Sequence, residues 1–169
     1  RYSVLGELQA SAVESAKDMI ADKEERIERG LAEGKLLIEE KRFAEAKDLL
    51  EKLAREFPRD SDLRARIAEL FIGGELFEEA FSYLDEAIEL SPDQIHHYNR
   101  IGIVLRKLRK YDIAEKYFMR ATEFAKSDPN LYFNLGRLYI DWARWDKAEK
   151  ASRLALRLSP GFVEARKLL

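Results

Sequence analysis

The sequence contains no cysteine, only two histidines, four prolines and eight glycines among its 169 residues. Without cysteine the chain can form no disulfide, no zinc–thiolate site and no thiol nucleophile. It also lacks a run of about 18 apolar residues, which is the length that a membrane-spanning helix needs, and it shows no signal-peptide pattern. The lack of cysteine fits a reducing compartment, so we expect a cytoplasmic location and no membrane span.

Catalytic groups are equally scarce. The two histidines, His96 and His97, are adjacent, and neighbours on a helix point to different faces, so they cannot easily share a metal or serve one triad. We expect both on the surface. Carboxylates are abundant, but pairs such as Glu78 and Glu79 fall at expected helix ends, whereas acid catalysis by paired carboxylates needs a pocket that raises one pKa. We therefore expect no enzyme, no metal site and no cofactor.

What the sequence does contain is a regular ladder. An aromatic residue is followed three positions later by alanine, and each such pair lies 34 residues after the previous one, at Phe43–Ala46, Phe77–Ala80, Tyr111–Ala114 and Trp145–Ala148. A fixed period in this range marks stacked supersecondary units. Small residues recur at the same period at Gly34, Ala68, Gly102 and Gly136, and we expect them to let two helices of one unit approach closely. Trp145, as a ladder residue, is expected in the core, and Trp142 is expected to be partly exposed.

This pattern resembles the tetratricopeptide repeat (TPR) family. The closest matches to the family pattern lie in the last unit, at Tyr132, Leu135, Gly136, Tyr139, Ala148, Ala155 and Pro160. The first unit departs most, because Gly30 and Glu33 stand at its aromatic and leucine positions. The resemblance covers Ile27 to Phe162, and it implies an all-α fold: a right-handed α-solenoid, the TPR superhelix of helix-turn-helix repeats.

The repeat phase predicts the domain organisation. We expect repeats at 27–60, 61–94, 95–128 and 129–162, and the start of a C-terminal capping helix at 163–169. Asp60 or Ser61 should cap one helix, and Asp128 with Pro129 should begin another. Apolar residues at helical spacing predict a separate helix over 3–21, within an N-terminal extra segment, 1–26, that is either a half-repeat or a cap covering the first repeat. Since the chain begins with Arg1, we expect it to be part of a longer protein.

The charge is segregated along the chain. Residues 61–94 carry two basic and nine acidic side chains, whereas residues 95–128 carry eight basic and four acidic ones. Such a field can steer a partner or promote head-to-tail contact between copies, or it can simply be a solvated surface. The basic run at 106–110 could bind nucleic acid, but the net charge of −2 and the lack of a stacking platform argue against it.

The resemblance implies that the first helix of each repeat lines a concave groove. Carrying that phase onto this sequence gives a candidate peptide-binding set in repeats three and four: Asn99, Arg100, Ile103, Arg106, Asn130, Phe133, Asn134, Arg137 and Ile140. Asparagine can hydrogen-bond a peptide backbone, and arginine can pair with carboxylates in bidentate fashion. The apolar members stand where the repeat does not require them, and exposed apolar patches usually mark interfaces.

These observations predict a non-enzymatic protein–protein interaction scaffold, or adapter. It would bind a peptide or helix of a protein partner that carries acidic and apolar residues. We expect no small-molecule substrate. Two alternatives stay open. One is self-association, as a head-to-tail or helix-swapped homo-oligomer. The other is a regulatory arm of a larger signalling or assembly protein.

Overall fold

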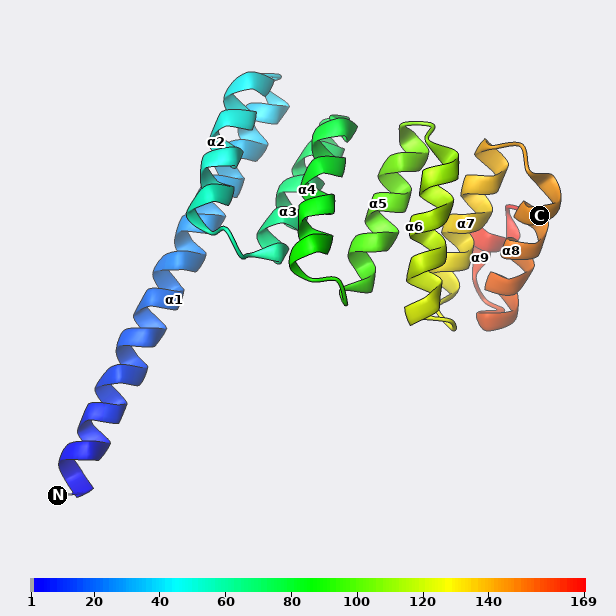
Figure 1. Ribbon diagram of the computed structural model, residues 1–169. Helices are drawn as coiled ribbons and strands as arrows, with labels where there is room; N and C mark the ends of the chain where they lie inside the picture. Colours follow the sequence, from blue (N-terminus) through cyan, green and yellow to red (C-terminus); the bar gives the residue numbers. More distant parts are fainter. Residues whose placement is uncertain (1) are drawn as a thin grey trace. The chain divides into compact units, whose positions relative to one another are not determined.

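The computed structural model describes residues 2–169, and every regular element within them is a helix (Figure 1). The helices are α1 (Tyr2–Glu39), α2 (Phe43–Glu56), α3 (Ser61–Gly73), α4 (Phe77–Leu90), α5 (Ile95–Lys107), α6 (Tyr111–Phe124), α7 (Pro129–Asp141), α8 (Trp145–Leu158) and α9 (Val163–Arg166). The chain divides into two compact units, the first ending at Pro58 and the second running from Arg59 to Leu169. This all-α arrangement of helical repeats confirms the predicted solenoid class.

The first unit is a hairpin of α1 and α2. The prediction of a separate helix over 3–21 is wrong, because α1 is one continuous helix of 38 residues. No proline and no glycine pair interrupts the chain between Ala21 and Glu24, so the helix simply continues. The side chains of residues 3–26 are exposed, so this segment does not cover the first repeat as a cap. Figure 1 shows α2 alongside the second half of α1 only.

The contact between α1 and α2 depends on two glycines. A Cβ atom added at Gly30 would lie 2.8 Å from a methyl group of Leu53, and one at Gly34 would lie 2.6 Å from a methyl group of Leu50. Both distances are shorter than carbon atoms tolerate, so a Cβ atom at either position would force the facing leucine to shift. Leu50 and Leu53 are fully buried as a result.

The second unit stacks three helical hairpins, α3–α4, α5–α6 and α7–α8, followed by the single turn of α9 (Figure 1). Its core is made by large apolar side chains that recur at the repeat period, among them Phe71, Leu84, Ile101, Phe118 and Leu138. Gly102 has the same role as the glycines of α1, since a Cβ atom there would lie 2.6 Å from the ring of Phe118.

The structure confirms the helix caps that were predicted from the sequence. The side chain of Asp60, rather than that of Ser61, caps α3 by accepting a hydrogen bond of 2.9 Å from the backbone N–H of Leu63. Asp128 caps α7 by accepting from the backbone N–H of Asn130, and Pro129 occupies the first turn of that helix. Each cap satisfies a backbone donor that the helix itself leaves unpaired.

The tight turn inside each repeat has a backbone conformation that was not predicted from the sequence. One residue per turn has a positive φ between 57° and 62°, and these residues again recur every 34 positions, at Lys41, Glu75, Arg109 and Ala143. None of them is glycine, although left-handed backbone is unfavourable for residues with a Cβ atom. In the last turn, the N–H groups of Ala143 and Arg144 return to the carbonyl groups of Ile140 and Tyr139, which closes the helix end.

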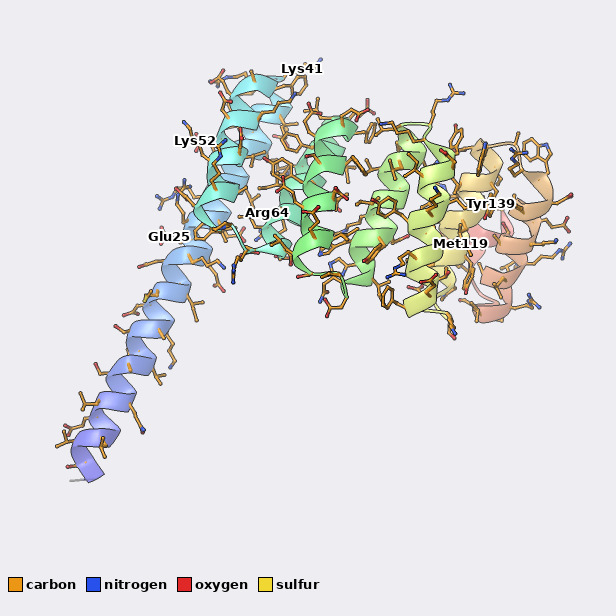
Figure 2. The ribbon with its side chains drawn as sticks, viewed as in Figure 1. Glu25, Lys41, Lys52, Arg64, Met119 and Tyr139 are labelled. Carbon is orange, nitrogen blue, oxygen red and sulfur yellow. The ribbon has the colours of Figure 1, made fainter. Side chains whose placement is uncertain are left out.

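Ion pairs join consecutive repeats of the second unit. Lys110 Nζ lies 3.5 Å from Glu78 Oε1, and Lys147 Nζ lies 3.3 Å from Glu115 Oε2. Arg64, labelled in Figure 2, is largely buried and pairs with Glu86 at 3.3 Å within its own repeat. The segregated charges of the sequence therefore meet partly across the repeat boundaries.

The two tryptophans differ from the sequence prediction. Trp145 was expected in the core, but it is 65% exposed. Trp142 is partly exposed as expected, and its ring lies 6.1 Å from that of Tyr111, the ladder aromatic of the preceding repeat. A ladder aromatic is thus covered by the repeat that follows it. No further repeat follows Trp145 in the described residues, so its ring stays in solvent.

The prediction that both histidines lie on the surface is also wrong. His96 is exposed, but His97 is 1% exposed and takes the position that Leu63 and Leu131 occupy in the neighbouring repeats. Its Nδ1 atom is buried without a hydrogen-bond partner. Burial, together with the nearby His96 and Arg100, lowers the pKa of His97 to about 4, while Asp62 opposes the shift. The neutral imidazole fills a position in the core, but it buries one polar atom that makes no hydrogen bond.

Replacing Ala143 by glycine should stabilise the protein. Ala143 is exposed and has a φ of 57°, so the change removes only a methyl group from a strained turn. We expect the free energy of unfolding to rise by about 0.5–1 kcal/mol. Ala32→Gly is the matched control, because the same change at an exposed position inside α1 should lower stability by about 1 kcal/mol. Urea unfolding measures both; a loss of stability in Ala143→Gly would contradict the strain argument.

His97 should make the fold sensitive to acid. Its pKa falls from 6.5 to about 4 on folding, so in this window the unfolded chain binds a proton that the folded chain does not. Stability is therefore full above pH 6.5 and falls as the pH drops, by about 1–2 kcal/mol between pH 7 and pH 5. His97→Leu should remove this part of the pH dependence and His96→Leu should retain it. Urea unfolding at both pH values checks this, and equal losses in both variants would count against it.

Candidate functional site

All nine predicted site residues lie on α5 and α7, the first helices of repeats three and four, which contact each other directly. Their exposure is unequal. Asn130 and Arg137 are exposed, Arg106 is buried, and the others are partly exposed. The contacts of each side chain decide which of them can meet a ligand.

Two predicted asparagines bind each other. The Nδ2 group of Asn134 on α7 donates a hydrogen bond of 2.8 Å to Oδ1 of Asn99 on α5. Each amide keeps a further polar atom on the side away from this bond, and both residues are partly exposed. The pair therefore holds the two helices in register and still presents hydrogen-bonding groups.

Arg100 contacts the preceding repeat, whereas Asn99 contacts the following one. Its Nε lies 2.9 Å from Oε1 of Glu69 on α3, and its side chain keeps about a third of its surface in solvent, 38%. The carboxylate partner was not identified from the sequence. Arg100 is thus partly neutralised before any ligand arrives, which makes it a weaker candidate for binding acidic groups.

Arg106 has a different role from the predicted one. Its side chain is 8% exposed, and its guanidinium donates to Oδ2 of Asp141 at the end of α7. A buried arginine that is already paired with a carboxylate in the next repeat is not free to bind a ligand. We therefore assign Arg106 to the packing of α5 against α7 and leave it out of the binding surface.

Phe133 and Arg137 combine a partly exposed aromatic ring with an exposed positive charge. The ring of Phe133 packs at 4.9 Å from that of Phe162, which precedes α9, and the Arg137 guanidinium carbon lies 5.8 Å from the Phe133 ring centre. A guanidinium beside an aromatic face is held by a cation–π interaction and keeps its hydrogen-bond donors outward. This pair offers an apolar surface next to a positive charge.

The remaining three residues are dispersed. Asn130 lies in the first turn of α7, where its Nδ2 donates to Asp128 at 3.1 Å. Ile103 is partly exposed on α5. Ile140 lines a hollow of about 460 Å³ together with Trp145, Leu168 and Leu169, near the C-terminal end of the second unit. The structure therefore does not gather all nine residues into one site.

A basic hollow beside α8 was not predicted from the sequence. It has a volume of about 640 Å³ and is lined by Lys150, Arg153, Leu156, Arg157, Pro160 and Leu169. The signal was present, because Lys150, Arg153 and Arg157 have the spacing of one helix face. Arg153 is already paired with Glu149 at 2.8 Å, so the positive charge of the hollow is partly offset.

Two findings limit the chemistry of the described residues. Between residues 2 and 169, no three histidine, aspartate or glutamate side chains come together as metal ligands. None of the helices in that stretch combines the length and the apolar character that a membrane crossing requires.

Comparison with known proteins gives the family. A profile described as tetratricopeptide repeat matches residues 37–102, and a second profile of the same description matches 96–128 and 129–162. Together they cover most of the chain, which therefore belongs to the tetratricopeptide repeat family. Proteins of this family are typically non-catalytic scaffolds for protein interaction, and the protein carries the corresponding fold.

Among curated proteins, the chain is similar to protein O-mannosyl-transferase TMTC3. It is 25% identical to the human protein and 26% identical to the mouse protein over 91 residues, which is 54% of this chain and 10% of either relative. The chain thus spans about a tenth of the length of the curated relatives it matches.

Solved structures resemble it in fold. YrrB, described as a TPR protein with an unusual peptide-binding site, is 24% identical with a TM-score of 0.67, and the match covers 79% of this chain and 69% of YrrB. A crystal structure of MamA is 19% identical with a TM-score of 0.69, covering 85% of this chain and 79% of MamA. At these identities the likeness shows the fold alone.

Loss of the charge should destabilise the protein at Arg106 but not at Arg137. We expect Arg106→Met to lower the free energy of unfolding by about 1–3 kcal/mol, because it leaves Asp141 without its partner at the α5–α7 contact. Arg137→Met, the matched control on the exposed side, should stay within about 0.5 kcal/mol of the wild type. Urea unfolding compares the two; equal stability of both variants would contradict a structural role for Arg106.

Proposed function

We propose that the protein is an interaction scaffold that binds an acidic and partly apolar peptide, or the helix of a protein partner, on the second unit. The binding surface would be the α5–α7 face, defined as Asn99, Ile103, Phe133, Asn134 and Arg137. The observation that carries this proposal is the pairing of a partly exposed Phe133 ring with the exposed Arg137 guanidinium.

The chemistry of the face selects the class of ligand. An aromatic side chain in a packed setting serves as an anchor for an apolar residue, and anchors of this kind carry most of the energy at interfaces. The adjacent guanidinium can bind a carboxylate in bidentate fashion. An acidic residue next to an apolar one in the partner would meet both groups at once.

The asparagine pair adds the means to hold a peptide backbone. The Asn99–Asn134 bond fixes both amides on neighbouring helices before a ligand arrives. Preorganised polar groups lower the entropy that binding costs. An amide can both donate and accept, which matches the alternating N–H and C=O groups of an extended chain.

The relatives support the class of function and go no further. YrrB is a TPR protein with a peptide-binding site, which makes peptide capture a reasonable task for a chain of this fold. As a second candidate we propose a regulatory arm of a larger protein, which the small share of TMTC3 that the chain matches supports. The cytoplasmic location stays a prediction from the lack of cysteine.

The test begins with a display library of random peptides, selected on the intact chain and titrated by fluorescence anisotropy. We expect enrichment of Asp or Glu next to Leu, Ile or Phe, and affinity that falls with added salt. Arg137→Glu should weaken binding at least about tenfold, since it replaces attraction by repulsion, and Phe133→Ala should weaken it similarly.

Arg153→Glu is the matched control, because it makes the same charge reversal in the basic hollow beside α8. It should leave the affinity within about twofold. If Arg153→Glu abolishes binding and Arg137→Glu does not, the α5–α7 face is the wrong surface and the hollow is the binding site.

A further inference from the structure

The first half of α1 carries an apolar surface that nothing in its own unit covers. Leu5, Leu8 and Met19 are 60%, 62% and 73% exposed, and Val4, Val13 and Ile20 are also exposed. Figure 2 shows side chains projecting from this part of α1, below the level marked by Glu25, with no α2 beside it. A helix of a water-soluble domain normally buries such a stripe against another element.

The uncovered stripe continues an established interface. At about 100° per residue, Leu5, Ala12 and Ala16 lie on the same side of α1 as Gly30 and Gly34, which face α2. The covered part ends where α2 ends, because Arg26 pairs with Glu56 at 3.1 Å and Lys23 lies over the ring of Phe57. The stripe therefore extends for about 25 Å beyond the end of α2.

The charges of this segment lie away from the stripe. Residues 3–20 contain four charged side chains, Glu7, Glu14, Lys17 and Asp18, and all of them fall within an arc of about 100° on the opposite side of the helix. Lys17 and Glu14 approach each other there, at 3.8 Å. A second copy of the stripe could therefore pack against the first without bringing like charges together.

Apart from Val13, whose counterpart is Ser11, the spacing of the stripe is symmetric about Ala12. Leu8 and Ala16 lie four residues before and after it, Leu5 and Met19 lie seven before and after, and Val4 and Ile20 lie eight before and after. In an antiparallel pair of identical helices with a two-fold axis at Ala12, each residue faces its counterpart on the other side of the centre. Leu8 then meets Ala16, a large residue against a small one, and Leu5 meets Met19.

We propose that two copies of the protein associate through residues 4–20 of α1, packed antiparallel with the two-fold axis at Ala12. The N-terminal segment of each copy takes the place, along the partner's α1, that lies directly beyond the partner's α2. The pair buries roughly 1,000 Å² in total, at the lower end of specific interfaces, so the dimer forms in the micromolar range.

Sedimentation equilibrium of the full chain, from about 1 µM to a few hundred µM, tests the association. We expect the mass to rise from one chain to two. Leu8→Glu combined with Met19→Glu should weaken the dimer at least about tenfold. Ala10→Glu combined with Ala21→Glu is the matched control, because it adds the same charge on the opposite side of the helix. It should leave the dimer within about twofold.

Cross-linking tests the orientation, and the absence of cysteine makes it clean. Ala12→Cys should form a disulfide-linked dimer under mild oxidation. Leu5→Cys mixed with Met19→Cys should form the mixed dimer, whereas Leu5→Cys alone should stay uncrosslinked, since antiparallel pairing keeps the two copies of residue 5 about 20 Å apart.

Several outcomes overturn the proposal. A monomer at every concentration does so, as does a dimer that survives Leu8→Glu with Met19→Glu. Efficient cross-linking of Leu5→Cys alone would show a parallel pair. Binding of a monomeric chain to lipid vesicles, lost in the same double variant, would assign the stripe to a membrane surface. Arg137→Glu should leave the dimer intact, so this result stands apart from peptide binding.

Discussion

The close approach of the two helices within a repeat is the constraint on which the rest of the structure depends. At Gly34 and Gly102 there is no room for a Cβ atom, because Leu50 and Phe118 fill the space in front of the helix backbone. This contact brings the large side chains of both helices into one layer and removes them from water. It also sets the period, since every repeat needs its small residue at the same distance from its partner. The helices, turns and stacking of the second unit follow from that spacing.

Residue spacing predicts the helices and their caps well because both depend on contacts within a repeat. The all-α fold class and the caps at Asp60 and Asp128 depend on residues close in sequence. The errors arise where a side chain is governed by a neighbouring repeat. Trp145 fits the ladder, but its burial needs a following repeat that the described residues do not contain. His97 looks polar, yet its position belongs to the core. Of the candidate site, the placement on two adjacent helices was predictable, whereas the burial of Arg106 was not, because its partner is 35 residues away.

The charged side chains are likewise governed by contacts with neighbouring repeats. Read along the chain, an acidic repeat followed by a basic one suggests a field directed at other molecules. In the structure, Lys110 reaches Glu78 and Arg100 reaches Glu69, so opposite charges of adjacent repeats meet. Exposed pairs of this kind add little stability individually. Arg137, beside Phe133, is left as an exposed positive group on the α5–α7 face.

In the second unit each helix packs mainly against the helices next to it in sequence. Forming these contacts closes only short loops, which costs little chain entropy. Chains with such local contacts fold rapidly, and any hairpin can serve as the starting point from which order spreads to its neighbours. Within the second unit, α9 packs mainly against α7 and α8, so it should open first. Hydrogen exchange would then be fastest in the single turn of α9 and slowest in α5 and α6, which have a hairpin on either side.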